Sequence, residues 1–163
     1  MNGAMLLPEF DHEMANTRRL LERLPEDHFD FKPHEKSFSL GDLASHVANV
    51  PTWTSLTFTT TELDLDQPWE REVPKDTAAL LAEFDANVAD ARKALEAVSA
   101  EELQVGWTLK SGDQVYFTQP RGAVFRSFVM NHLIHHRAQL TVYLRLLDVP
   151  VPGMYGPTAD EAM

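Results

Sequence analysis

The chain of 163 residues contains no cysteine, and this absence narrows the chemistry that its side chains can perform. Without thiols there is no disulfide framework, no thiolate metal site and no cysteine nucleophile. A metal ion bound by this chain must therefore be held by histidine, aspartate or glutamate.

Basic residues are also scarce, because 14 Lys and Arg stand against 25 Asp and Glu and leave a net charge of −11. Such an acidic surface repels phosphate backbones and anionic membranes, so we expect no nucleic-acid and no membrane partner. No apolar run approaches the roughly 20 residues of a membrane-spanning helix, and the first residues do not resemble a signal peptide. We therefore expect a cytoplasmic protein.

The rest of the composition, 44% hydrophobic and 24% charged, is typical of a folded protein, and the length suits a single domain, residues 1–163. Apolar residues recur at helical spacing in four segments, 5–24, 40–63, 77–98 and 121–147. Ser39 and Asp76 are favourable N-caps for the second and third helices. Pro51 lies inside the second helix and predicts a kink there.

The segments between these helices have other patterns. Residues 64–76 predict a polar loop, and the Pro- and Gly-rich residues after Leu147 predict a loop as well. Alternating apolar residues on both sides of Ser111-Gly112-Asp113 predict a small β-hairpin within residues 105–119. We therefore predict an all-α fold: a four-helix bundle with a small β-hairpin between the third and fourth helices.

The fourth helix carries the stretch NHLIHHRAQL, residues 131–140, with histidines at 132, 135 and 136. On a helical wheel of about 100° per residue, His132 and His136 flank the centre of the apolar stripe, and His135 lies nearer its edge. The wheel places three arginines of this helix on the side facing solvent: Arg126, Arg137 and Arg145. Two imidazoles at spacing i, i+4 can reach one metal ion from the same face.

His46, on the inner side of the second helix, is the candidate for a third ligand. A single inward histidine is more often a hydrogen-bonded core residue than a ligand. Three inward histidines on two helices would each need a buried partner, and one divalent ion satisfies all three. We therefore predict a metal site of His46, His132 and His136. We interpret His12, His28 and His34 as solvated residues. For His135 there are two interpretations, an outer hydrogen-bond donor to the site or a surface residue, and we favour the surface residue.

The stretches SFSLGDLASHVANVPTW, around His46, and FRSFVMNHLIHHRAQLTVYLRLLDVPVPGMYGPTADE, around His132 and His136, resemble the DinB family of metalloenzymes. The resemblance extends over nearly the whole chain and implies a four-helix bundle of up-down-down-up type, often a homodimer. It also implies that His46, His132 and His136 bind one divalent ion, usually zinc or nickel. Asp148 departs from the family pattern, since many relatives have glycine in this loop.

Characterised members of the family are thiol-dependent enzymes, so the resemblance implies an S-transferase that uses a low-molecular-weight thiol as co-substrate. The residues themselves leave alternatives open. Three imidazoles leave a coordination position free, which can take a thiol or a water molecule and would then serve a transferase or a hydrolase. A non-catalytic metal-binding protein of the stress response is the third possibility, and it is favoured if Trp53 and Phe128 seal the histidines from solvent.

Three neighbours of the histidines are candidate pocket residues for a small-molecule substrate: Asn49, Trp53 and Gln139. Packing in the core is an equally good interpretation of Trp53. Tyr116 on the hairpin would cover the site if the hairpin folds over it, which the sequence does not determine. No residue stands out as a general base.

Overall fold

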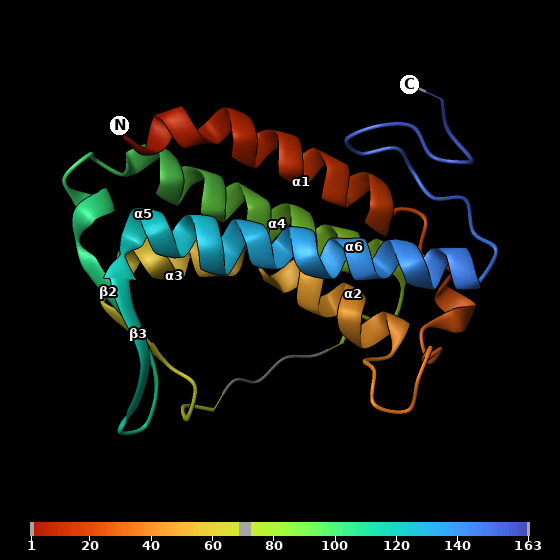
Figure 1. Cartoon of the computed structure of the whole chain (residues 1–163), viewed down its shortest axis with the longest axis horizontal. Coiled ribbons are helices and arrows are strands. Elements are labelled where there is room, and N and C mark those ends of the chain that lie inside the picture. Colours follow the sequence, from red (N-terminus) through yellow and green to blue (C-terminus); the bar gives the residue numbers. More distant parts are fainter. Residues whose placement is uncertain (1, 69–72, 163) are drawn as a thin grey trace.

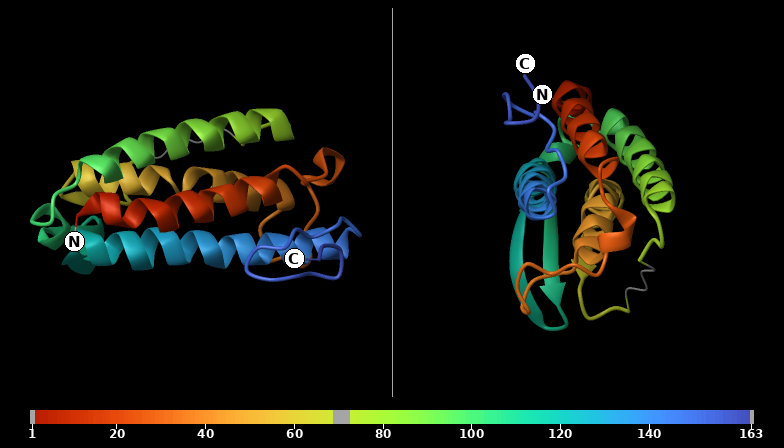
Figure 2. Two further views of the ribbon diagram at one scale, coloured as in Figure 1. Left: turned by 90° about the horizontal axis from the view of Figure 1, so that it is seen from above. Right: turned by 90° about the vertical axis from the view of Figure 1, so that its right-hand side faces the viewer.

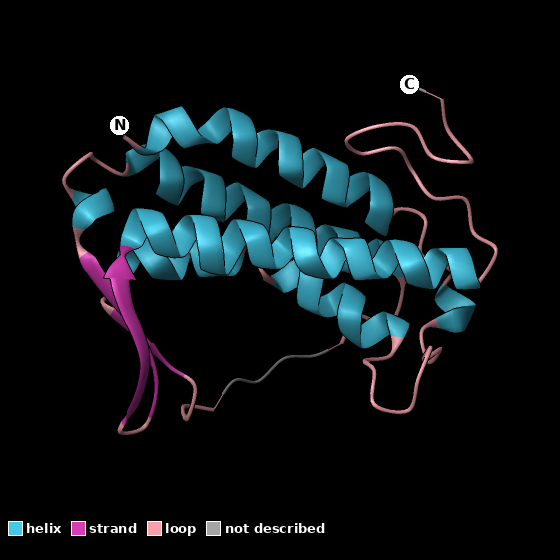
Figure 3. Cartoon of the chain, viewed as in Figure 1, coloured by secondary structure: helices cyan, strands magenta, loops and turns pink. Residues whose placement is uncertain are grey.

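The computed structural model describes residues 2–68 and 73–162, and most of them are helical (Figures 1 and 3). The main helices are α1 (Leu7–Leu21), α2 (Leu40–Asn49), α3 (Thr52–Thr59), α4 (Thr77–Ala97), α5 (Arg121–Val124) and α6 (Asn131–Leu146). Short 3-10 turns cover Gly3–Leu6, Glu26–His28 and Glu102–Gln104, and a π-helical segment, Phe125–Met130, joins α5 to α6. The strands are β1 (Glu62–Asp64), β2 (Gly106–Ser111) and β3 (Gln114–Pro120).

The helices pack side by side along their length (Figures 1 and 2). α1 contacts α4 and α6, and α2 contacts the same two helices. In Figure 1, α1 and the α5–α6 rod run in one direction, whereas α2, α3 and α4 run in the other. The apolar core between them draws side chains from every one of these layers, for example Phe10, Leu43, Phe84 and Leu140, each at most 1% exposed. Among the described residues, no helix combines the length and apolar character needed to cross a membrane.

The second and third predicted helices, observed as α2 and α4, begin at the N-caps that the sequence predicts. Ser39 caps α2 by accepting a hydrogen bond from the Asp42 N–H at 3.1 Å, and Asp76 caps α4 by accepting from Ala79 at 2.7 Å. Pro51 does more than kink a helix, because α2 ends at Asn49 and α3 begins at Thr52 as a separate helix.

The prediction that the second helix continues to Leu63 is wrong. Residues Glu62–Asp64 form β1, which pairs in parallel with β2, so the expected hairpin is part of a three-stranded sheet in the order β1-β2-β3. β2 and β3 are antiparallel and turn at Gly112, whose φ of +55° favours glycine. The sheet packs Trp107 and Leu109 against Val124 at the start of the α5–α6 rod. Part of the predicted polar loop 64–76, residues 69–72, lies outside the described residues.

The fourth predicted helix is continuous but not uniformly α-helical. Its residues Phe125–Met130 form a π-helical turn directly before the histidine-bearing helix α6. α6 then ends at Leu146, and Asp148 in the following turn has φ +55°. This left-handed conformation favours glycine, and aspartate tolerates it better than most side chains do.

The prediction that Arg137 faces solvent is wrong: its side chain is 1% exposed and is ion-paired with buried Glu13 at 2.6 Å. Its guanidinium also donates to Glu13 O and Thr17 Oγ1, at 3.0 and 3.1 Å, and to the Tyr155 hydroxyl. Tyr155 donates in turn to Glu13 Oε2 at 2.6 Å. The error has a physical cause, because α6 packs against α1 as well as α2 and therefore buries a second face. Arg126 and Arg145 are exposed, as the wheel predicts.

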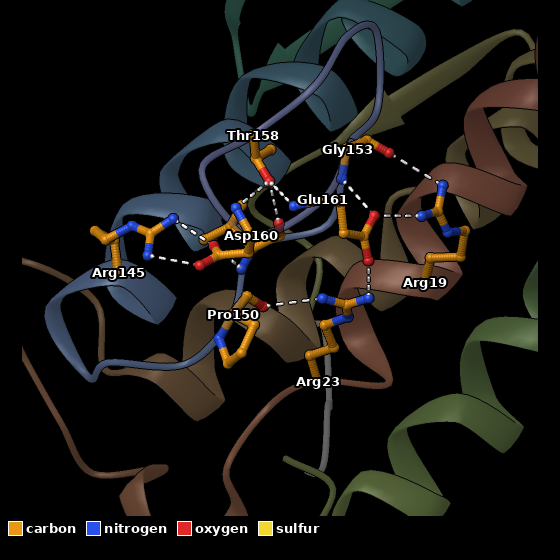
Figure 4. A network of polar contacts seen from close by, with 9 residues as sticks. Arg19, Arg23, Arg145, Pro150, Gly153, Thr158, Asp160 and Glu161 are labelled. Carbon is orange, nitrogen blue, oxygen red and sulfur yellow. Dashed lines mark hydrogen bonds and ion pairs between the residues drawn. The ribbon is translucent and has the colours of Figure 1, made fainter. Parts of the chain in front are cut away.

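The residues after α6 form an ordered loop, and charged side chains attach it to the helices (Figure 4). Glu161 pairs with Arg19 at 2.9 Å and with Arg23, while Asp160 pairs with Arg145. Asp160 and Glu161 also accept hydrogen bonds from the backbone of Val151 and Gly153. The loop thus holds Tyr155 over the buried Arg137–Glu13 pair.

Candidate metal centre

Three helices supply the side chains of the candidate site. The Ser39 cap fixes the start of α2, and His46 lies two turns later on it. The break at Pro51 sets the direction of α3, which carries Trp53. His132 and His136 lie one turn apart on α6, which contacts α2.

The structure brings the three predicted ligands together. The Nε2 atoms of His46 and His132 are 2.9 Å apart, and one nitrogen from each of the three rings lies within 4.8 Å of the others. The His136 ring centroid is 4.6 Å from that of His46 and 4.5 Å from that of His132. All three residues are half-buried. Residues 86 positions apart in the chain therefore form one compact imidazole cluster.

This cluster fits a divalent ion. A tetrahedral zinc ion with Zn–N bonds of about 2.0–2.1 Å separates its nitrogen ligands by roughly 3.3 Å. The observed separations, 2.9 Å between the Nε2 atoms of His46 and His132 and at most 4.8 Å among the three rings, bracket this value, so small side-chain rotations are sufficient. Without an ion, the 2.9 Å contact is a hydrogen bond that one imidazole donates to the other. Neutral imidazoles suit zinc, nickel, copper or iron.

Aromatic rings cover one side of the cluster. Trp53 and Phe128 stack with a centroid distance of 4.7 Å, and both rings meet His132 edge-on, at 5.0 and 5.9 Å. The other histidines lie outside the cluster: His12, His28, His34 and His135 are exposed. The His135 ring is nevertheless only 4.8 Å from that of His136.

Gln139 contacts the cluster directly. Its Oε1 lies 2.7 Å from Nδ1 of His136, so this nitrogen carries the proton and Nε2 keeps a free lone pair for a metal. Loss of such an outer partner commonly weakens metal binding by about 10–100-fold. We expect Gln139→Leu to lower zinc affinity by at least about tenfold, and Gln139→Glu, which retains an acceptor, to bind nearly as well as wild type. A competition titration with a chromophoric chelator measures both. Equal affinities of wild type and Gln139→Leu would show that the hydrogen bond has no such role.

Burial favours the neutral form of His132 and His136. The pKa of His132 is lowered to about 4, first by burial and then by the proximity of His136 and His135. The pKa of His136 is also lowered, mainly by burial, although the hydrogen bond with Gln139 acts in the opposite direction. A neutral imidazole is the form that binds a metal, so His132 does not lose its ligand function to protons at pH 6.

A pH dependence of stability follows for the metal-free protein. The unfolded chain takes up a proton on His132 near pH 6.5, whereas the folded chain does so only near pH 4. The contribution of neutral His132 to the free energy of unfolding is therefore fully present above pH 6.5. It is lost progressively as the pH falls from 6.5 towards 4, so the free energy of unfolding decreases over this range. Chemical unfolding at several pH values should show this slope, and His132→Gln should reduce it. A midpoint near 6.5 for His132 in an NMR titration of the folded protein would contradict this expectation.

Two cavities open beside the cluster. The inner cavity, about 180 Å³, is lined by His46 and by two of the predicted pocket residues, Asn49 and Trp53. Residues of β1 and of the turn after it line it as well, namely Leu63, Asp64, Leu65 and Gln67. The outer cavity, about 410 Å³, is lined by His136 and by the third predicted pocket residue, Gln139. It also includes Lys36, Ser37, Phe38, Val142 and Tyr143.

Sequence reasoning missed the wall that β1 contributes to the inner cavity. The signal for this strand is the alternation of acidic and apolar residues from Glu62 to Asp66, which reads ELDLD. Its parallel pairing with β2 joins residues more than 40 positions apart and cannot be read from local pattern. Tyr116 on β3 is exposed, and the described residues that line the two cavities do not include it.

Comparison with known proteins identifies the family of the chain. The family model described as "DinB family" matches residues 1–163. The chain is similar to a protein of Bacillus subtilis strain 168, the uncharacterized protein YrdA, with 28% identity over 160 residues that cover 95% of this chain and 89% of that one.

Solved structures of DinB-like proteins have the same fold. One from Bacillus cereus ATCC 10987 superposes with a TM-score of 0.71 at 21% identity, covering 92% of this chain and 95% of that chain. The YjoA protein from Bacillus subtilis gives a TM-score of 0.70 at 21% identity, covering 90% and 96%. At these identities the structural likeness shows the fold alone, whereas the family model matches the whole length. The chain belongs to the DinB family.

Proposed function

We propose that this protein is a divalent-metal-dependent enzyme, and specifically a thiol S-transferase. The observation that carries the proposal is that three imidazoles from two helices form one cluster, and that two separate cavities open beside this cluster. His46 lines the inner cavity and His136 lines the outer one. A transferase must hold a thiol and an electrophile beside the same centre, and this arrangement offers a place for each.

Each residue then has a defined role. His46, His132 and His136 would hold zinc or nickel through neutral imidazoles, and Gln139 fixes the orientation and protonation of the His136 ring. When bound, the ion would lower the pKa of a thiol at its open position, so that the thiol is present as thiolate at neutral pH. Trp53 and Phe128 exclude water from one side of His132.

The transfer itself balances without a further reagent. The sulfur forms a bond to the electrophilic carbon, and the bond from that carbon to its leaving group breaks. The leaving group departs with the bonding electron pair, and the proton released by the thiol compensates its charge. The chain therefore has only to bind, orient and shield the two reactants.

The openness of the site favours catalysis over simple metal storage. A cluster sealed by Trp53 and Phe128 would support a non-catalytic binding protein, but His46 and His136 both border cavities. A hydrolase would use the same residues with water at the open position. The two enzymatic alternatives therefore differ in the nucleophile and not in the metal ligands.

One experiment tests the proposal in two steps. The protein is purified without a metal-affinity tag, and its zinc and nickel are measured. It is then incubated with monochlorobimane and, separately, bacillithiol, mycothiol or cysteine. We expect about one ion per chain and a metal-dependent rate of thiol conjugation. Bound metal without thiol conjugation would refute the transferase, and ester hydrolysis without any thiol would support the hydrolase.

The proposal also covers the domain organisation, cellular location and oligomeric state of the enzyme. We propose a single domain over residues 1–163, arranged as a four-helix bundle of up-down-down-up type, that acts in the cytoplasm as a homodimer on a small-molecule substrate. The directions of the helices in Figure 1 support the arrangement. Light scattering on the purified protein tests the dimer, and a mass equal to one chain would refute it.

A further inference from the structure

We propose that the inner cavity binds the electrophilic co-substrate, and that this ligand is an apolar molecule the size of one aromatic ring, without a negative charge. The role of this ligand as a co-substrate rests on the proposed function. The binding preference itself rests only on the lining of the cavity, and it can be measured whether or not the protein proves to be a transferase.

The size and lining of the cavity define the ligand. An apolar cavity of about 150 Å³ is large enough for benzene, and the inner cavity measures about 180 Å³. The Trp53 ring and the side chains of Leu63 and Leu65 supply apolar contact. The amides of Asn49 and Gln67 offer hydrogen bonds to one polar substituent. A single ring with a short neutral substituent matches this lining.

The charge of the β1 wall excludes anions. Asp64 lines the cavity, and its Oδ1 accepts hydrogen bonds from the N–H groups of Gly112 and Asp66 at 3.0 and 3.1 Å. These two bonds hold the pKa of Asp64 below its ordinary value, so the carboxylate is ionised at neutral pH. The half-buried Asp64 therefore gives this wall a negative charge at neutral pH.

The neighbouring charges do not cancel it. Glu62 and Asp66 flank Asp64 in the sequence. Within the described part of the chain, Asp64 is ion-paired with Lys110, whose Nζ lies 2.6 Å from Glu62 and 4.0 Å from Asp64 Oδ2. Among the described residues of this segment, one ammonium group paired with Glu62 and Asp64 stands against three carboxylates, so their sum is negative. An anionic ligand in the inner cavity would thus be repelled by the ionised Asp64 in its lining.

The outer cavity has the opposite character. Lys36 lines it, and the described residues of its lining include no carboxylate. The two openings beside the histidine cluster therefore differ in charge as well as in size. This difference assigns the uncharged apolar reactant to the inner cavity and leaves the outer one for a larger and more polar partner.

A pair of probes that differ in charge but scarcely in shape tests the inference. Methyl phenyl sulfone is neutral, benzenesulfonate is an anion of nearly the same form, and both are weak ligands for metal ions. Each is titrated into the purified wild-type protein, and binding is followed by the NMR signal of the Trp53 indole N–H. We expect the sulfone to bind at least about tenfold more tightly than the sulfonate, since only the sulfonate is repelled by the Asp64 carboxylate.

Two substitutions identify the source of the selectivity. Asp64→Asn keeps an oxygen for the Gly112 and Asp66 N–H groups, so the turn should remain, and the preference should shrink towards equality. Asp113→Asn makes the same chemical change on the exposed hairpin turn, outside the lining, and should keep the preference. Circular dichroism confirms that both variants are folded.

The inference is overturned if the sulfonate binds as well as the sulfone, if neither probe shifts the Trp53 signal, or if Asp64→Asn leaves the preference unchanged. These outcomes are separate from those that test the proposed function. Metal content and thiol conjugation decide whether the protein is a metal-dependent transferase, and the probe pair decides only what the inner cavity accepts.

Discussion

His132→Ala is expected to abolish stoichiometric metal binding while leaving the helices folded. His132 lies 2.9 Å from His46 and one turn before His136, so its removal leaves two imidazoles for the ion. Loss of an outer hydrogen-bond partner already costs about 10–100-fold in affinity, and loss of a ligand should cost more. Elemental analysis of wild type and variant, purified side by side, gives the metal content, and circular dichroism monitors the fold.

His135→Ala is the matched control for this experiment. His135 is exposed on the same helix, and its ring is 4.8 Å from that of His136 but outside the cluster. We expect this variant to retain its metal. Stoichiometric metal in His132→Ala would rule out the three-histidine site, and loss of metal in both variants would point to a general disturbance of α6.

Arg137→Leu should produce the largest loss of stability among single changes on α6, about 3–5 kcal/mol. Arg137 is 1% exposed and neutralises Glu13, which is 6% exposed, so the substitution leaves an uncompensated carboxylate in the interior. It also removes the hydrogen bonds to Glu13 O, Thr17 and Tyr155. Urea unfolding of the metal-free protein measures the free energy of unfolding.

Two comparisons make this prediction specific. Arg126→Leu breaks an ion pair with Glu9 whose side chains are 54% and 42% exposed, and it should cost less than about 1 kcal/mol. Glu13→Leu combined with Arg137→Leu removes both charges and should be more stable than Arg137→Leu alone. Equal losses for Arg126→Leu and Arg137→Leu would show that the buried pair is not a major source of stability.

Much of the helical framework can be predicted from the sequence because its signals are local. Ser39 and Asp76 satisfy free N–H groups at helix starts, and Pro51 lacks the donor that a continuous helix requires. β1 could not be placed in this way. Its pairing with β2 depends on residues far apart in the chain, and its short ELDLD pattern competes with the end of the preceding helix.

The candidate ligands could also be predicted from local sequence pattern, whereas the residues around them could not. A helical wheel identifies His132 and His136 as inward residues when one buried face is assumed. α6 in fact buries a second face against α1, with Leu133, Arg137 and Leu144 all at most 1% exposed. Arg137 therefore seemed solvent-facing on the wheel. The inner cavity was equally hidden, because half of its wall comes from β1 and the turn after it.

Because of the π-helical turn at Phe125–Met130, the rod formed by α5, this turn and α6 contains more residues than a regular α-helix of the same length. The rod links the sheet at its first residues to His132 and His136 near its middle, and each residue along it corresponds to about 100° of rotation. Deleting one residue within the turn would restore regular hydrogen bonding. The same deletion would change the rotation of the residues before it relative to α6 by about 100°. The number of residues in this short segment therefore sets the orientation of the sheet, including the β1 wall beside His46, relative to the histidines of α6.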